Sequence, residues 1–149
     1  MSETQHLDLE KAAAHLLEEC RMVLPGIQAL FGFQLIAVFS DGFRRELSTG
    51  QQRLHLVAVV SVVIAIALVM APAAIHRLRE PRSVSASFLK ASSRLLMLGM
   101  VPLAVGTVID VYLVAIAVVH SAAIAGIAAA FAAVAFIGLW GVMPLRLRL

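Results

Sequence analysis

Residues 93–120 read SRLLMLGMVPLAVGTVIDVYLVAIAVVH and place one acid inside an apolar segment long enough to cross a membrane. From Leu95 to Val119 the segment makes about 37 Å of helix, against about 30 Å of hydrocarbon in a bilayer. Asp110 lies about 4.5 Å from its midpoint. Because a charge at that depth costs roughly 2.5–3.5 kcal/mol, we expect Asp110 to face other protein and to have a partner.

The composition of the whole chain is that of a membrane protein. Of its 149 residues, 61% are hydrophobic and 14% are charged, whereas soluble proteins average about 45–50% and about 25%. This length leaves room for one small helical bundle. The net charge of +3 comes from basic residues near span ends rather than from a basic face, so we expect no nucleic-acid partner.

Hydropathy predicts an all-α, polytopic membrane protein with four transmembrane helices plus an N-terminal amphipathic helix. Residues 1–21 repeat apolar side chains at helical spacing and carry five acids against two bases, which favours a cytoplasmic helix that docks on protein. Residues 22–149 are expected to form one four-helix bundle. Turn chemistry at Asp41-Gly42 and at Thr49-Gly50 predicts a loop over residues 41–55. The expected spans are residues 22–40, 56–75, 95–119 and 122–143.

Small residues are expected to let the helices approach closely, and prolines to bend them. In the third span, Gly99 and Gly106 fall on the same stripe as Asp110, which predicts that the acid faces a neighbouring helix. The expected packing residues are Gly99, Gly106, Gly126, Ala130 and Ala133, and the expected bends are at Pro25, Pro72 and Pro102.

The distribution of lysine and arginine predicts the orientation of the chain. Nine of these residues fall in the N-terminal segment, in residues 76–94 and at the C-terminus, while three fall in residues 41–55. By the positive-inside rule, both termini are expected in the cytoplasm. The acidic N-terminal helix then lies on the same side as the basic connection 76–94, and we expect the two to pack together.

Three motifs carry a resemblance to a known family. They are LPGIQALFGFQLIAVF at residues 24–39, VMAPAAIHRL at residues 69–78 and GMVPLAVGTVIDVYLV at residues 99–114. With these motifs the chain resembles the uncharacterised bacterial four-span membrane protein family called domain of unknown function 6328. The resemblance implies the four-span layout and a bacterial plasma (inner) membrane, and it carries no established activity.

Asp110 is the main candidate for a functional residue, and two interpretations stand. It could be a protonatable or cation-binding group in a pathway that also includes Gln34 and Asp41, since acids within spans often mark such routes. Gln34 and Asp41 are seven residues apart and share one helix face. Alternatively, Asp110 is a structural acid that is neutral or paired with Arg44 or Arg45, with Gln34 as a hydrogen-bond donor.

No enzyme, cofactor or metal site is expected. His55, His76 and His120 fall at the ends of the predicted spans without metal-ligand spacing, and no nucleophile and base occur in a catalytic arrangement. The first functional hypothesis is therefore a homo-oligomeric transport protein for protons or monovalent cations that uses Asp110. The second is a non-catalytic membrane scaffold that docks a cytoplasmic protein partner through the N-terminal helix and residues 76–94.

Overall fold

The computed structural model describes residues 3–79 and 85–146, and all the regular elements within them are helices. Four of the helical stretches are long and apolar enough to cross a membrane: Leu9–Val38, Thr49–Leu78, Ala86–Val119 and Ala122–Arg146. The predicted all-α class with four such helices is confirmed. The elements are α1 (Glu3–Val38), α2 (Asp41–Glu46), α3 (Thr49–Arg79), α4 (Ala86–Val119), α5 (Ala122–Phe136), the π-helical turn η1 (Ile137–Val142) and α6 (Met143–Arg146).

Helix α1 is continuous where the sequence predicted two elements. It runs through the expected boundary at residue 21, and Pro25 lies inside it. The segment predicted as a separate amphipathic helix is therefore the first half of one long helix, apart from residues 1–2, which lie outside the described part. Proline costs least in the first turn of a helix, whereas Pro25 lies well inside α1.

The predicted loop over residues 41–55 is wrong, because most of it is helical. Ser40 caps α2 by accepting a hydrogen bond from the backbone N–H of Phe43. Ser48 and Gln51 then form a reciprocal capping box: the Ser48 N–H donates to Gln51 Oε1 at 2.8 Å, and the Gln51 N–H donates to Ser48 Oγ at 3.4 Å. This cap starts α3 at Thr49, so His55 lies inside the helix and not at its end.

The third and fourth long helices are joined by a tight turn at residues 120–121, the two residues between the predicted spans 95–119 and 122–143. His120 takes the left-handed conformation, with φ of 53°, and its N–H closes α4 on the carbonyl of Ile116. Ser121 caps α5 by accepting from the N–H of Ile124. At its other end, α4 begins at Ala86 behind the cap residue Ser85, so the helix extends beyond the predicted span, which starts at residue 95.

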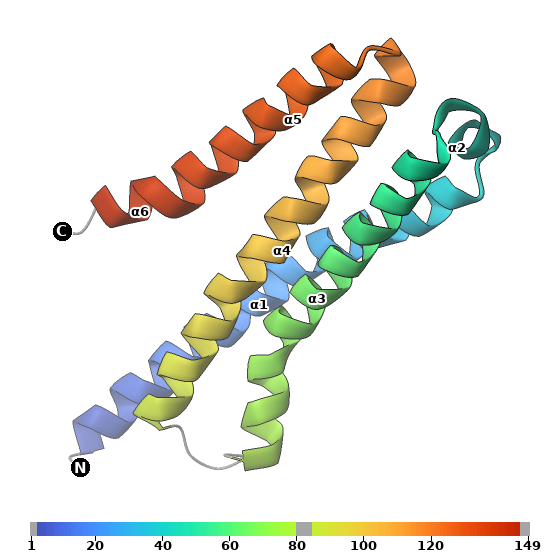
Figure 1. Ribbon diagram of the computed structural model, residues 1–149. Helices are drawn as coiled ribbons and strands as arrows, with labels where there is room; N and C mark the ends of the chain where they lie inside the picture. Colours follow the sequence, from blue (N-terminus) through green and yellow to red (C-terminus); the bar gives the residue numbers. More distant parts are fainter. Residues whose placement is uncertain (1–2, 80–84, 147–149) are drawn as a thin grey trace.

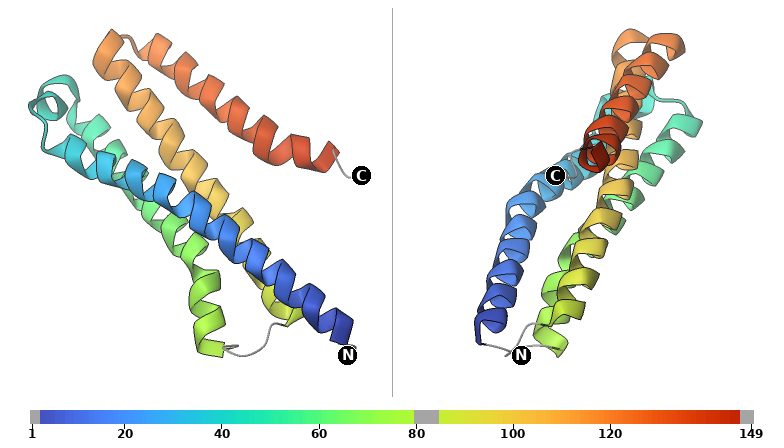
Figure 2. Two further views of the ribbon diagram at one scale, coloured as in Figure 1. Left: turned by 180° about the vertical axis from the view of Figure 1, so that it is seen from behind. Right: turned by 90° about the vertical axis from the view of Figure 1, so that its left-hand side faces the viewer.

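Helices α1, α3 and α4 pack together, whereas α5 lies along α4 at the edge (Figures 1 and 2). Helix α2 and the α4–α5 turn lie at one end of the molecule, and the start of α1 and the start of α4 lie at the other (Figure 1). The fourth long helix therefore extends a three-helix group instead of closing a symmetrical bundle. Near the start of α1, Ala13 packs with Phe88 in a small apolar cluster, as expected for an N-terminal segment that meets residues 76–94, of which residues 80–84 lie outside the described part.

Two of the predicted packing glycines sit where α3 and α4 approach most closely. A Cβ on Gly106 would lie 2.9 Å from Val62 Cγ2 and 3.1 Å from the carbonyl oxygen of Ala58, and one on Gly99 would lie 3.3 Å from side-chain atoms of Leu68 and Val69. Gly126 on α5 has open space at the same position. The small residues of α4 therefore make the helix contact, while Gly126 does not.

The three prolines that were expected to bend helices all lie inside long helices: Pro25 in α1, Pro72 in α3 and Pro102 in α4. Each removes one backbone donor from its helix. Helix α3 changes direction toward its C-terminal end, in the stretch that contains the buried Pro72 (Figure 1). Ala130 and Ala133 lie on α5, where Ala130 is exposed and Ala133 is partly covered.

Candidate functional site

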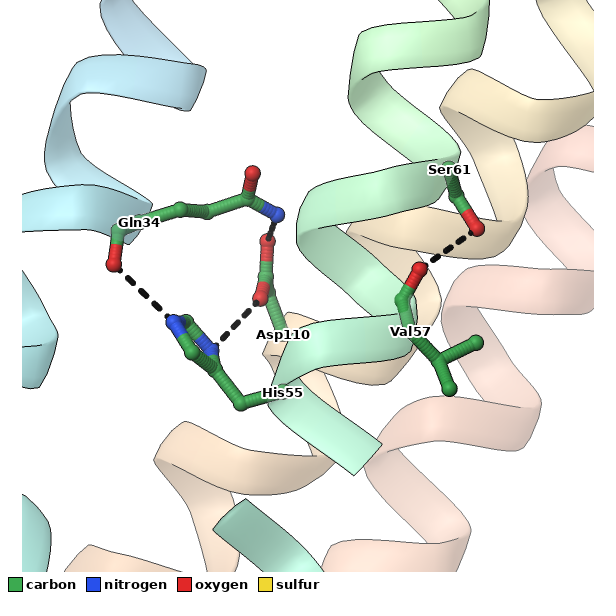
Figure 3. Close-up of polar contacts among 5 residues, drawn as sticks. All are labelled: Gln34, His55, Val57, Ser61 and Asp110. Carbon is green, nitrogen blue, oxygen red and sulfur yellow. Dashed lines mark hydrogen bonds and ion pairs between the residues drawn. The ribbon is translucent and has the colours of Figure 1, made fainter. Parts of the chain in front are cut away.

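Asp110 on α4 is held by one residue from α1 and one from α3 (Figure 3). The Gln34 Nε2 amide donates a hydrogen bond of 2.7 Å to Asp110 Oδ2. Nδ1 of His55 lies 3.7 Å from Asp110 Oδ1. The Asp110 side chain is 19% exposed and that of His55 is 8% exposed, so most of the interaction is shielded from solvent and is correspondingly strong.

The backbone of Gln34 determines which nitrogen of His55 carries a proton. Nε2 of His55 lies 2.9 Å from the main-chain carbonyl oxygen of Gln34, and a carbonyl oxygen can only accept. Nε2 must therefore be the N–H donor. In a neutral imidazole this leaves Nδ1 without a hydrogen, and Nδ1 is the nitrogen that faces the carboxyl group of Asp110.

The cluster contains more acceptors than donors. Gln34 is 3% exposed, and its Oε1 has no hydrogen-bond partner. Asp110 Oδ1 and a neutral His55 Nδ1 face each other, and neither brings a proton to the contact. Since buried acceptors cost free energy when they lack a donor, one proton bound to either Asp110 or His55 Nδ1 satisfies the pair.

A pocket of about 450 Å³ opens beside these three residues and is bounded by α1, α2, α3 and α4. Most of its wall is apolar, with Phe33 and Phe43 contributing aromatic rings. Phe43 also covers His55, with the two rings in an edge-to-face arrangement at a centroid distance of 5.1 Å. The ionisable residues that line the pocket are Glu46, His55 and Asp110.

A second acid–histidine pair lies near this pocket, at the α2 end of the molecule. Glu46 Oε2 is 3.7 Å from Nδ1 of His120, the residue that ends α4. Both side chains are largely exposed. The pocket therefore has one partly buried carboxyl group, Asp110, and one more exposed carboxyl group, Glu46.

The structure separates Asp41 from the other two predicted pathway residues. Asp41 is on the surface, with its side chain 92% exposed, and its Oδ2 lies 3.5 Å from Arg45 Nη2. Arg44 is also exposed. The alternative in which Arg44 or Arg45 pairs with Asp110 is therefore not what the structure shows, whereas the hydrogen bond from Gln34 to Asp110 is present.

His55 is the residue of this cluster that sequence reasoning missed. Its position was assigned to a span end because Gly50 and the polar residues around it looked like a loop. The signal that could have found it is the Ser48 to Gln51 spacing of a capping box, which places the helix start six residues before His55.

The described residues contain no group of three or more His, Cys, Asp or Glu side chains arranged to hold a metal ion. The arrangement around Asp110 is suited instead to binding one proton or one positively charged group. It combines a carboxyl group, an imidazole nitrogen and an amide within helices that could cross a membrane.

The fold and the site together define a small polytopic α-helical membrane protein with a polar cluster between its first three long helices. The model of the family described as Family of unknown function (DUF6328) matches residues 2–144. The chain belongs to this family, as its sequence motifs indicated. Comparison with curated proteins and with solved structures gave no match.

Proposed function

We propose that this protein moves protons or monovalent cations across a membrane and that Asp110 is the group that binds and releases the transported charge. The observation that carries the proposal is the shielded carboxyl group of Asp110, which has a hydrogen bond from Gln34 and faces Nδ1 of His55. Ionisable groups within spans commonly mark proton or ion routes. This role makes the protein a transporter rather than an enzyme.

The cluster can hold Asp110 in two protonation states. When Asp110 is ionised, Gln34 Nε2 donates to Oδ2, as observed. When Asp110 carries a proton on Oδ2, rotation of the Gln34 amide would present Oε1 as the acceptor. Because Gln34 serves either state, a proton can arrive and leave without stranding the carboxyl group, and His55 Nδ1 offers a second place for the proton.

The route from Asp110 to water is proposed to run through the pocket toward α2. The pocket connects the buried Asp110 with the exposed Glu46. On the other side of Asp110, the close packing of α3 and α4 at Gly106 and Gly99 leaves little room for water. One chain of this size is thin for a complete path, so the proposal includes a homo-oligomer, for which the exposed apolar side chains of α5, such as Ile127 and Phe131, offer a surface.

The proposed location is a bacterial plasma membrane with both termini in the cytoplasm. The excess of lysine and arginine at one end of the helices supports this orientation. In this orientation the pocket faces away from the cytoplasm, since α2 is at the opposite end from the start of α1 (Figure 1).

The test compares proton and potassium flux in proteoliposomes. We expect flux from the wild type, none above background from Asp110→Asn, and wild-type flux from Asp41→Asn. The Asp41 variant is a matched control because it removes a carboxylate of the same type from the exposed surface. Equal flux from wild type and Asp110→Asn, or no flux from the wild type, would end the proposal.

The second candidate is a membrane scaffold that docks a protein partner on the cytoplasmic side. The observation that favours it is the exposure of Glu10, Glu18 and Glu19 on the first half of α1. The apolar side of that half already packs on its own chain, through Ala13 and Phe88, so a partner would meet mainly the acidic side. Deletion of residues 1–20 should then release a co-purifying protein. A scaffold transports no ions, so neither the full-length nor the shortened protein should show flux that depends on Asp110.

A further inference from the structure

We infer that the pocket beside Asp110 binds a protonated lipophilic amine, that is, an ammonium group with an apolar body. The inference rests on the proposed function and specifies the cation that would exchange with the proton. It is drawn from three features of the pocket: its charge, its unsatisfied acceptors and its apolar wall.

The charge of the pocket favours a cation. Of the residues that line it, Asp110 and Glu46 are acids, and none is lysine or arginine. Each acid faces a histidine Nδ1 atom, at 3.7 Å in both cases. A neutral histidine leaves the negative charge of its acid uncompensated, so a bound cation would have a carboxylate on the deep side and another on the exposed side.

The unsatisfied acceptors favour a cation that carries N–H groups. Gln34 lines the pocket, and among the described residues its Oε1 atom has no donor, but that atom is itself buried, so a ligand reaches it only after the amide rotates. Asp110 Oδ1 accepts no hydrogen bond, and its neighbour His55 Nδ1 is an acceptor whenever the imidazole is neutral. An ammonium group supplies up to three donors, which a quaternary ammonium or an alkali ion does not.

The wall of the pocket favours an apolar body on that cation. Leu30, Phe33 and Phe43 are among the mostly apolar residues that line it, and its volume of about 450 Å³ is within the range of about 300–1,000 Å³ that is usual for small-molecule sites. Aromatic faces attract ammonium groups. A hydrated metal ion would leave this wall unused, and divalent ions need about six oxygen ligands.

A free amine fits better than the headgroup of an aminophospholipid, although both present an ammonium group. In the lipid a phosphate lies next to the ammonium, and the two acids of the pocket would repel it.

The titratable groups around the bound cation come from three elements. They are Glu46 on α2, His55 on α3, and Asp110 on α4 with His120 directly after it, while α1 contributes the neutral Gln34.

The experiment is calorimetric titration of 2-phenylethylammonium into the full-length protein in phosphatidylcholine nanodiscs. We expect saturable binding by the wild type and by Asp41→Asn. Asp110→Asn should weaken binding about tenfold or more, because it removes a shielded charge partner. Glu46→Gln should weaken it about two- to fivefold, because that carboxylate is exposed. Glu46→Gln changes a surface side chain, so it tests the site without putting the fold at risk.

Two further arms separate the parts of the inference. The neutral analogue 2-phenylethanol should bind about tenfold more weakly than the amine. Ala37→Phe should remove amine binding, because Ala37 lines the pocket and a larger side chain fills it. Equal affinity for alcohol and amine would overturn the charge argument, and unchanged binding by Ala37→Phe would overturn the assignment to this pocket.

The outcome also distinguishes this inference from the proposed function. Absence of saturable amine binding in a protein whose proton flux depends on Asp110 would overturn the inference and leave the proposed function standing. Amine binding that depends on Asp110, in a protein without any flux, would overturn the proposed function and leave the amine site standing. Addition of phosphatidylethanolamine to the nanodiscs should leave the affinity for the amine unchanged, and competition by that lipid would overturn the choice of a free amine.

Discussion

Gln34 joins three helices through two different groups. Its side-chain amide donates to Asp110 on α4, and its main-chain carbonyl accepts from His55 on α3. A substitution at this position therefore removes the contact with Asp110 and keeps the contact with His55. This separation makes Gln34 the residue at which the contribution of the amide can be measured alone.

Replacement of Gln34 by leucine should destabilise the folded protein by about 1–2 kcal/mol, because Asp110 loses its donor while still shielded from water. Gln28→Leu is the matched control, since Gln28 is on the same helix and exposed, and it should change stability by less than about 0.5 kcal/mol. Reversible unfolding in detergent micelles measures both. Equal effects from the two variants would contradict the structural role given to Gln34.

Nitrogen-15 NMR of the labelled histidines tests the protonation of His55. We expect Nε2 of His55 to carry a directly bonded proton at every pH at which the protein is folded, because it donates to a carbonyl oxygen. The resonances of His55 are assigned as those that disappear in His55→Gln. A neutral His55 with its proton on Nδ1 and none on Nε2 would contradict the geometry.

At this scale, the sequence was informative about Asp110 and Gln34 and not about His55. An acid or an amide inside an apolar segment is conspicuous, because hydrocarbon offers it no partner. A histidine near a span end is ordinary there, so its role depends on where the helix begins. That boundary is decided by two side chains, Ser48 and Gln51, whose cap extends α3 by two turns.

At the scale of the elements, α3 and α4 form the closest pair because glycines on α4 meet side chains of α3. Gly106 is the tighter site, since a Cβ there would overlap Val62 and press on the backbone of Ala58. The stripe that contains Gly99, Gly106 and Asp110 could be predicted from the helical period. The sequence could not show that the small-residue stripe on α5 makes no such contact, because small residues permit close approach without requiring it.

Gly106→Ala should therefore destabilise the protein by about 1–3 kcal/mol, the usual cost of overpacking, whereas Gly126→Ala should leave stability unchanged or raise it by up to about 1 kcal/mol through helix propensity. Thermal unfolding of the two variants side by side measures the difference. A larger loss for Gly126→Ala than for Gly106→Ala would mean that α5, and not α3, makes the close contact.

At the scale of the whole molecule, hydropathy was sufficient to predict the number of long helices, because lipid requires each crossing to be a long apolar helix. It could not predict that α5 lies at the edge of the group, since all four helices are apolar on most faces. The tight turn at His120 makes α5 a neighbour of α4 in any arrangement. Which further helices it touches depends on side-chain packing that periodicity does not encode.

Thiol labelling in intact cells tests the proposed orientation. In a Cys20→Ala background, Gly50→Cys at the start of α3 should react with a membrane-impermeant maleimide from outside, and Ala86→Cys at the start of α4 should react only after the membrane is opened. We expect this pattern because basic residues are in excess near the start of α4, and the positive-inside rule places such a segment in the cytoplasm. The opposite labelling pattern would invert the protein and place the pocket on the cytoplasmic side.

The proposed function depends most on the exchange of a proton by Asp110 inside the membrane, and infrared difference spectroscopy between neutral and acidic pH measures this exchange directly. We predict that acidification of the reconstituted protein produces a C=O band of a protonated carboxylic acid. Because every protonated carboxyl group contributes such a band and the chain has nine Asp and Glu residues, the difference spectrum of Asp110→Asn should lack one component that the wild type and Asp41→Asn share. A difference spectrum of Asp110→Asn identical to that of the wild type would contradict the account.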